Sequence, residues 1–348
     1  MRKIMMAVAI AIAVSASGEQ KNVQLLTGMS DQQLQRTMNF IRASLGVHCD
    51  FCHVVNDKTG WDFANDDKQT KRTAREMIQM TERINEQSFN GNLEVSCHTC
   101  HRGAIRPVPL PILPQSPPPF PTPISTRPAL PPLTDVVKKY TTALGNVSKL
   151  QLPRILKGTR EGSDGKPLPF ELQEATGKAH VIVETPNGNL EQASNGTSGW
   201  SRNSKGMQTF NESEMENFRQ LTSAYAPLLP DSISADARVV AKDKVGDHEV
   251  IVVAARVNET TRQRLYFDTT TGLLVRRLVL TRTSIGEIPQ QTDFDDYRDL
   301  GGARFPFFVK LSLVDPWVGS TRRYSDVKLG AKVDDSVFNP PAESRPSS

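Results

Sequence analysis

Cys49-Asp50-Phe51-Cys52-His53 and Cys97-His98-Thr99-Cys100-His101 organise the first third of this chain of 348 residues. Both stretches have the pattern C-x-x-C-H, and together they contain all four cysteines of the sequence. This pattern is typical of covalent c-type haem attachment. The two thiols of each motif add to the vinyl groups of one porphyrin, and the following histidine binds its iron. The sequence therefore predicts two covalently bound c-type haems, with His53 and His101 as iron ligands.

Two alternatives use the same cysteines. One C-x-x-C pair is also found in redox dithiols, and two pairs together are found in zinc sites. The pairs lie farther apart here than zinc sites usually place them, and each is followed at once by a histidine. Both features favour haem.

A helix is predicted before the first motif. Ser30 followed by Gln33 forms a capping-box pattern, and Gly46 is a typical end. One face of this helix is apolar and carries Leu34, Met38, Ile41 and Leu45. Met38 is therefore a candidate second ligand, placing its thioether on the iron opposite His53.

A second helix, roughly 71–87, precedes the second motif and repeats this layout. Met77 lies on its apolar face and Met80 lies one turn further on. Either methionine is a candidate ligand for the second iron, although a methionine on an apolar face is often only core filler. The duplicated arrangement favours Met38, and Met77 over Met80, as ligands. His48 and His98 lie beside or inside the motifs and are interpreted as solvated residues or partners of haem carboxylates.

The run from about Asn22 to Pro107 resembles the photosynthetic reaction-centre cytochrome c subunit family. The resemblance is carried by residues 21–26, by Met38 with Ser44-Leu45-Gly46, by residues 73–80 and by Cys97 to Gly103. It implies the axial pairs His53 with Met38 and His101 with Met77. Well-known members carry four haems, whereas this chain has one pair of motifs. In those members a distant histidine also ligates one haem, and the matching loop here, 88–95, contains no histidine.

Histidine–methionine ligation fills both axial positions and raises the reduction potential. We therefore expect an electron-transfer protein without catalytic residues rather than an enzyme. Its expected partner is a membrane electron-transfer complex, either a reaction centre or a respiratory complex. The alternative is a haem-based redox or gas sensor, or a ligand-binding module, whose C-terminal part binds an apolar ligand or a partner. A formal net charge of +4 points to neither nucleic acid nor an anionic membrane.

Residues 1–17 have the features of an export signal. Arg2 and Lys3 precede a short apolar run, and Val14-Ser15-Ala16 is a typical cleavage site. The expected location is the periplasm, with any membrane association through a partner. A membrane anchor is the alternative interpretation of these residues.

The sequence predicts a multidomain protein, with residues 18–105 as a mostly α-helical dihaem cytochrome c domain. Half of the prolines fall in 106–133, which is predicted to be an extended linker that acts as a spacer. Residues 134–348 are predicted to be an α+β domain with a curved or partly closed antiparallel sheet. It opens with a helix at 134–144, has another near 213–226, and contains many strand-like runs.

This C-terminal part resembles the lipoprotein-carrier fold, in which helices pack inside a curved sheet. The resemblance rests on the strand pattern and on residues 265–268 and 271–277. It implies a hollow that takes an apolar ligand or a partner's segment, and a packed docking domain is the alternative. His180 and His248 are each interpreted as isolated structural residues. The acidic run from Asp293 to Asp299 is interpreted as a solvated edge, with weak calcium binding as the alternative.

Overall fold

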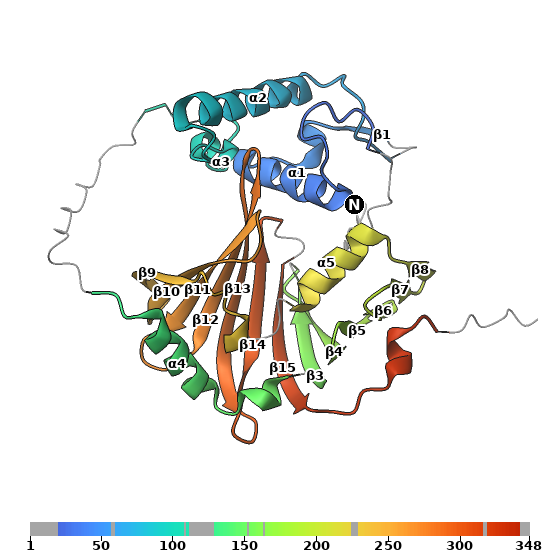
Figure 1. Ribbon diagram of the computed structural model, residues 1–348. Coiled ribbons are helices and arrows are strands. Elements are labelled where there is room, and N and C mark those ends of the chain that lie inside the picture. The colour runs from blue at the N-terminus through green and yellow to red at the C-terminus, as the bar shows by residue number, and fades with distance from the viewer. Residues whose placement is uncertain are drawn as a thin grey trace, which may run out of the picture.

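A computed structural model describes residues 20–56, 60–107, 109–110, 129–151, 153–162, 164–223, 229–315 and 319–341. The predicted export signal and most of the proline-rich segment lie outside these residues. The described chain has an N-terminal helical part and a C-terminal part built on one large sheet (Figure 1). Among the described residues, no helix combines the length and the apolar composition that a membrane crossing needs.

Among the described residues, three α-helices, one 3-10 turn and one short hairpin form the N-terminal part. Their bounds are α1 (Asp31–Leu45), η1 (Cys49–Phe51), β1 (Val54–Asn56), β2 (Gly60–Asp62), α2 (Gln69–Phe89) and α3 (Cys97–His101). α1 has the predicted bounds, because the capping box of Ser30 and Gln33 starts it and Gly46 ends it in the left-handed conformation, at φ 67°. α2 begins two residues before its predicted start and ends two residues after its predicted end.

In the described residues of the C-terminal part there are helices α4 (Leu133–Leu144) and α5 (Glu212–Ser223), three short 3-10 turns and the strands β3 to β15. The turns are η3 (Val147–Leu150), η4 (Pro230–Ser232) and η5 (Asp335–Phe338). The strands are β3 (Arg154–Glu161), β4 (Pro167–Ala175), β5 (Lys178–Thr185), β6 (Gly188–Ser194), β7 (Gly199–Asn203), β8 (Gly206–Thr209), β9 (Arg238–Val245), β10 (His248–Arg256), β11 (Thr261–Asp268), β12 (Leu274–Thr283), β13 (Gly286–Asp299), β14 (Arg304–Leu313) and β15 (Ser320–Leu329).

All thirteen strands form one antiparallel sheet in the order β8-β7-β6-β5-β4-β3-β15-β14-β13-β12-β11-β10-β9. Two meanders, β3 to β8 and β9 to β15, join where β3 pairs with β15. β8 and β9 remain as its two edges, so the sheet is open. The predicted antiparallel sheet is confirmed, and the predicted partial closure is wrong.

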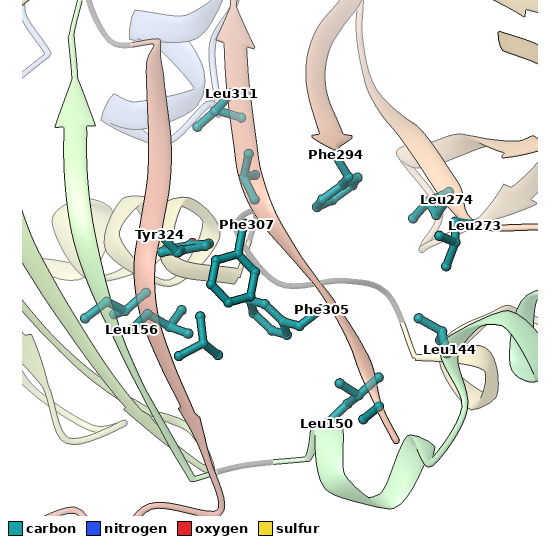
Figure 2. Close-up of a cluster of buried hydrophobic side chains, with 14 of the residues drawn as sticks. Leu144, Leu150, Leu156, Leu273, Leu274, Phe294, Phe305, Phe307, Leu311 and Tyr324 are labelled. Carbon is teal, nitrogen blue, oxygen red and sulfur yellow. The ribbon is translucent and has the colours of Figure 1, made fainter. Parts of the chain in front are cut away.

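The main core lies between this sheet and α4. Tyr140 and Leu144 of α4 are fully buried, and the Tyr140 ring packs against Phe267 with the ring centroids 5.0 Å apart. Figure 2 shows Leu144 and Leu150 close to the sheet residues Phe305 and Leu274. Buried apolar side chains therefore pack between α4 and this face of the sheet. A depression of about 450 Å³ near α4 lies at the surface.

A second, smaller core joins the two parts of the molecule. Its buried members are Leu26, Phe40, Ile78 and Ile285. Ile285 lies in the turn between β12 and β13, and Figure 1 shows this hairpin reaching α1 and α3. The sequence predicts two separate parts joined by a linker, and no pattern in it indicates this contact.

Candidate functional site

The first C-x-x-C-H motif forms a single 3-10 turn. The backbone N–H groups of Cys52 and His53 donate to the carbonyl of Cys49 at 3.3 and 3.0 Å, so both thiols and the imidazole leave one turn of chain. Cys49 is exposed and Cys52 is half-buried. Burial raises the pKa of the Cys52 thiol, against the effect of a hydrogen bond with Thr70. The turn therefore presents two thiols and one imidazole together.

The start of α2 holds this turn in place. Lys68 Nζ donates to the carbonyl of Asp50, and the Thr70 hydroxyl donates to the carbonyl of Phe51. These two carbonyls lie inside the motif. The first motif is thus fixed by the helix that leads to the second motif.

One aromatic ring packs against His53, and a second ring stacks on the first. The rings of His53 and Phe63 meet edge to face with centroids 5.1 Å apart, and Trp61 stacks on Phe63 at 5.4 Å. Burial, with the positive charge of Lys71 nearby, lowers the pKa of His53. The neutral imidazole, which is the form that binds a metal, is therefore favoured. Trp61 and Phe63 are themselves 48% and 56% exposed.

Lys71 holds the loop that carries Phe63 through hydrogen bonds to its backbone. Its Nζ donates to the carbonyls of Phe63, Ala64 and Asn65 at 2.9, 3.1 and 2.8 Å. It also forms a 2.9 Å ion pair with Asp66, and the whole residue is only 8% exposed. Hydrogen bonds from Arg75 and then Lys71 hold the pKa of Asp66 well below its usual range. A buried ammonium therefore fixes the loop that packs against His53.

The second motif forms the short helix α3. Ser96 and Thr99 form a capping box at its start, and Arg102 ends it in the left-handed conformation. His101 Nδ1 lies 3.0 Å from the carbonyl oxygen of Ala104, which can only accept, so Nδ1 carries the proton. In the neutral imidazole this tautomer leaves the lone pair of Nε2 for a metal. Such a hydrogen bond orients metal-ligating histidines in general.

Two helices hold the second motif. The Gly103 N–H donates to the carbonyl of Ser44 near the end of α1 at 2.8 Å. A Cβ on Gly46 would lie 2.1 Å from the Gly103 carbonyl oxygen, so this approach requires glycine. Asn85 of α2 donates to the Val95 carbonyl at 2.7 Å and accepts from the N–H groups of Glu94 and Val95. Each motif is therefore held partly by the helix that precedes the other.

Sequence reasoning misses Lys71 and Asn85. Both are buried polar residues on the inward face of α2, together with Ile78 and Thr81. A polar residue at the helical spacing of an apolar face is the signal that could have identified them.

The candidate methionines differ in exposure. Met38 is half-buried and packs against the small core, as does Cys97. Met77 is half-buried beside the fully buried Ile78, whereas Met80 is 37% exposed. His48 and His98 are both exposed, as their interpretation as solvated residues requires.

The residues fit two covalent haems better than one zinc. The four thiols are free, and among the described residues no three or more histidine, cysteine or acidic side chains gather to hold a metal ion. The two cysteine pairs thus do not form one four-cysteine centre. The N-terminal part also exposes several large apolar side chains, as expected of residues that a porphyrin would cover. They are Val55, Trp61, Phe63, Met80, Phe89 and Ile105.

The histidines of the C-terminal part are paired, so the interpretation of them as isolated is wrong. His180 Nε2 lies 2.9 Å from Glu191 Oε1, and Glu191 also accepts from Arg202. His248 Nδ1 lies 2.8 Å from Asp268. In the acidic run, Asp293 pairs with Arg276 and Asp296 with Arg298. Within the described residues, which include this acidic run, no three histidine, cysteine or acidic side chains are grouped so that they could hold a metal ion.

Comparison with known proteins bears on the N-terminal part. Residues 5–126 match the family model "Photosynthetic reaction centre cytochrome C subunit". Cytochrome c-554 of Chloroflexus aurantiacus is 36% identical over 90 residues, which cover 24% of this chain and 20% of that protein. The photosynthetic reaction center cytochrome c subunit of Roseobacter denitrificans is 36% identical over 90 residues, 24% of each chain. The chain thus spans about a quarter or less of these relatives, and the resemblance stated from the sequence is confirmed.

Solved structures resemble the C-terminal part. A putative outer membrane lipoprotein-sorting protein domain from Vibrio parahaemolyticus has a TM-score of 0.39 at 10% identity, covering 58% of this chain and 97% of that chain. A LolA superfamily protein from Nitrosomonas europaea has a TM-score of 0.39 at 11% identity, covering 60% and 98%.

Proposed function

We propose that this protein is an exported c-type cytochrome that carries electrons through two covalently bound haems. The observation that carries the proposal is the pair of C-x-x-C-H turns, each with free thiols and with an imidazole oriented by its surroundings. The match of residues 5–126 supports the same chemistry. When bound, the two haems would supply one-electron redox chemistry.

In this proposal Cys49, Cys52, Cys97 and Cys100 hold the haems, and His53 and His101 ligate the irons. Met38 and Met77 are the proposed second ligands. The place of Met77 on the apolar face of α2, in the layout that repeats the one around Met38, supports it over Met80.

We further propose that the mature protein works in the periplasm and exchanges electrons with a membrane complex. The relatives whose names include the photosynthetic reaction center support a complex of that kind, and a respiratory complex fits the same chemistry. The proposed domain division places the cytochrome at 18–105, a linker at 106–133 and the sheet at 134–348.

Carbon monoxide tests this function. With histidine and methionine on both irons, the reduced absorption spectrum should not change when carbon monoxide is added at neutral pH. Prompt formation of a carbon monoxide complex would instead show an open iron and would favour the sensor function. Met38→Ala should open one site and produce such a complex, while the exposed Val257→Ala serves as a control.

A further inference from the structure

The turn between β12 and β13 is buried inside the N-terminal part. Ile285 is 0% exposed and shares the small core with Leu26, Phe40 and Ile78. Its three buried partners all come from the N-terminal part. A segment this small buries few apolar side chains of its own, so one residue from outside is a large share of its core.

Gly286 brings the hairpin against the second motif. A Cβ at this position would lie 2.7 Å from the Phe40 ring and 3.1 Å from Cβ of Ser96, and its φ of 157° already disfavours a side chain. Phe40 is two residues from Met38, and Ser96 directly precedes Cys97. The tip therefore lies between the face of α1 that carries Phe40 and the start of α3.

Polar contacts surround this apolar contact. Arg42 of α1 pairs with Asp315 at 3.0 Å, and their side chains are 14% and 19% exposed. Arg282 Nη2 donates to the Gly91 carbonyl at 3.2 Å. On the other side, Gln32 of α1 bonds to Asn217 of α5. An apolar centre with a polar rim is the usual anatomy of a specific protein interface.

We propose that the tip of the β12–β13 hairpin, Ile285 and Gly286, is a positioning element for the second haem-binding motif. The large sheet then acts as a scaffold that docks on the cytochrome segment and completes the core beneath Cys97. The part of this inference that concerns haem rests on the proposed function. The docking itself rests only on the contacts between the two parts.

The test uses the mature full-length protein with a protease recognition sequence inserted between Pro117 and Pro118. After cleavage of the folded protein, size-exclusion chromatography and titration measure how tightly the two halves stay together. Hydrogen exchange measures the protection of residues 96–103. The variants are Ile285→Ala and Gly286→Ala. The matched controls are Val257→Ala, an exposed apolar residue, and Gly206→Ala, a positive-φ turn glycine with nothing within 4 Å of its Cβ position.

We expect the halves of the unsubstituted protein and of both controls to elute together. Ile285→Ala should weaken their association about a hundredfold, because it empties a fully buried site. In both hairpin variants residues 96–103 should exchange faster, while 49–53 should not change. Separation of the unsubstituted halves, or equal affinity in hairpin and control variants, would overturn the docking. Unchanged exchange of 96–103 in the hairpin variants would overturn the positioning role. These readouts do not use haem chemistry, so a failure of the proposed function would be seen separately.

Discussion

Removing the charge of Lys71 should release the loop that packs against His53. Lys71→Met keeps most of the aliphatic side chain and removes the ammonium group. The variant loses three hydrogen bonds to backbone carbonyls, at 2.8 to 3.1 Å, and one ion pair with Asp66. The Lys71 side chain is 10% exposed, so these bonds are shielded from water.

The expected loss of stability follows from these contacts. Each hydrogen bond from a charged donor contributes about 1.5 to 3 kcal/mol. Hydrogen bonds from water to the freed carbonyls offset part of this loss. The ion pair with Asp66 adds little to the loss, because the Asp66 side chain is 36% exposed. We therefore expect Lys71→Met to lower the free energy of unfolding by about 3 to 5 kcal/mol. Loss of a positive charge near His53 should also lower the reduction potential of the first haem, because the oxidised iron carries the greater positive charge.

Urea unfolding followed by circular dichroism measures the free energy, and hydrogen exchange of residues 63–66 measures the loop. Lys157→Met is the matched control, because Lys157 also pairs with a carboxylate, Glu171 at 2.7 Å, but its side chain is 48% exposed. The control should lose less than about 1 kcal/mol. An equal loss in both variants, with the loop still protected in Lys71→Met, would refute the role given to the buried ammonium.

Three further predictions concern charge and ligation. The pKa of Asp66 is depressed in the folded protein, so the stability that this carboxylate contributes is present above the unfolded carboxyl pKa of about 3.9 and is lost as the pH falls below that value. Asp66→Asn should therefore flatten this part of an acid-unfolding curve, and an unchanged curve would contradict the prediction. Met77→Ala should remove a methionine–iron charge-transfer band from the oxidised spectrum and Met80→Ala should not; the reverse result would exchange their roles. Arg154 Nε lies 2.5 Å from a carboxylate oxygen of the buried Glu174, so Arg154→Leu leaves that carboxylate without its partner. The substitution should lower the free energy of unfolding, measured by calorimetry, by about 3 to 5 kcal/mol. A loss under about 1 kcal/mol would contradict this prediction.

Local signals in the sequence predict the elements well. Ser30, Gln33 and Gly46 set the ends of α1, because caps act through neighbouring backbone groups alone. The strands of the C-terminal sheet follow from period-two apolar patterns and turn residues for the same reason. The openness of the sheet cannot be predicted in this way. Closure depends on whether the edge strands β8 and β9 pair with each other, and no local sequence pattern encodes that pairing.

The chemistry-bearing residues are also visible in the sequence, because two C-x-x-C-H motifs place thiols and imidazole within one turn each. The residues that hold these motifs in place cannot be identified from the sequence. Ile285 looks like any turn residue of a hairpin, yet it packs against Phe40, from which it is separated by most of the chain. Lys71 and Asn85 can be recognised in the sequence only as polar residues at the spacing of an apolar helical face, and the fold alone shows which carbonyls and amides they meet.

The intact mass of the protein, matured in a host that attaches c-type haem, tests the central claim most directly. Our account predicts the mass of the polypeptide plus two haems, and one haem fewer for a variant in which Cys97 and Cys100 are both replaced by alanine. A mass equal to that of the polypeptide alone would contradict it.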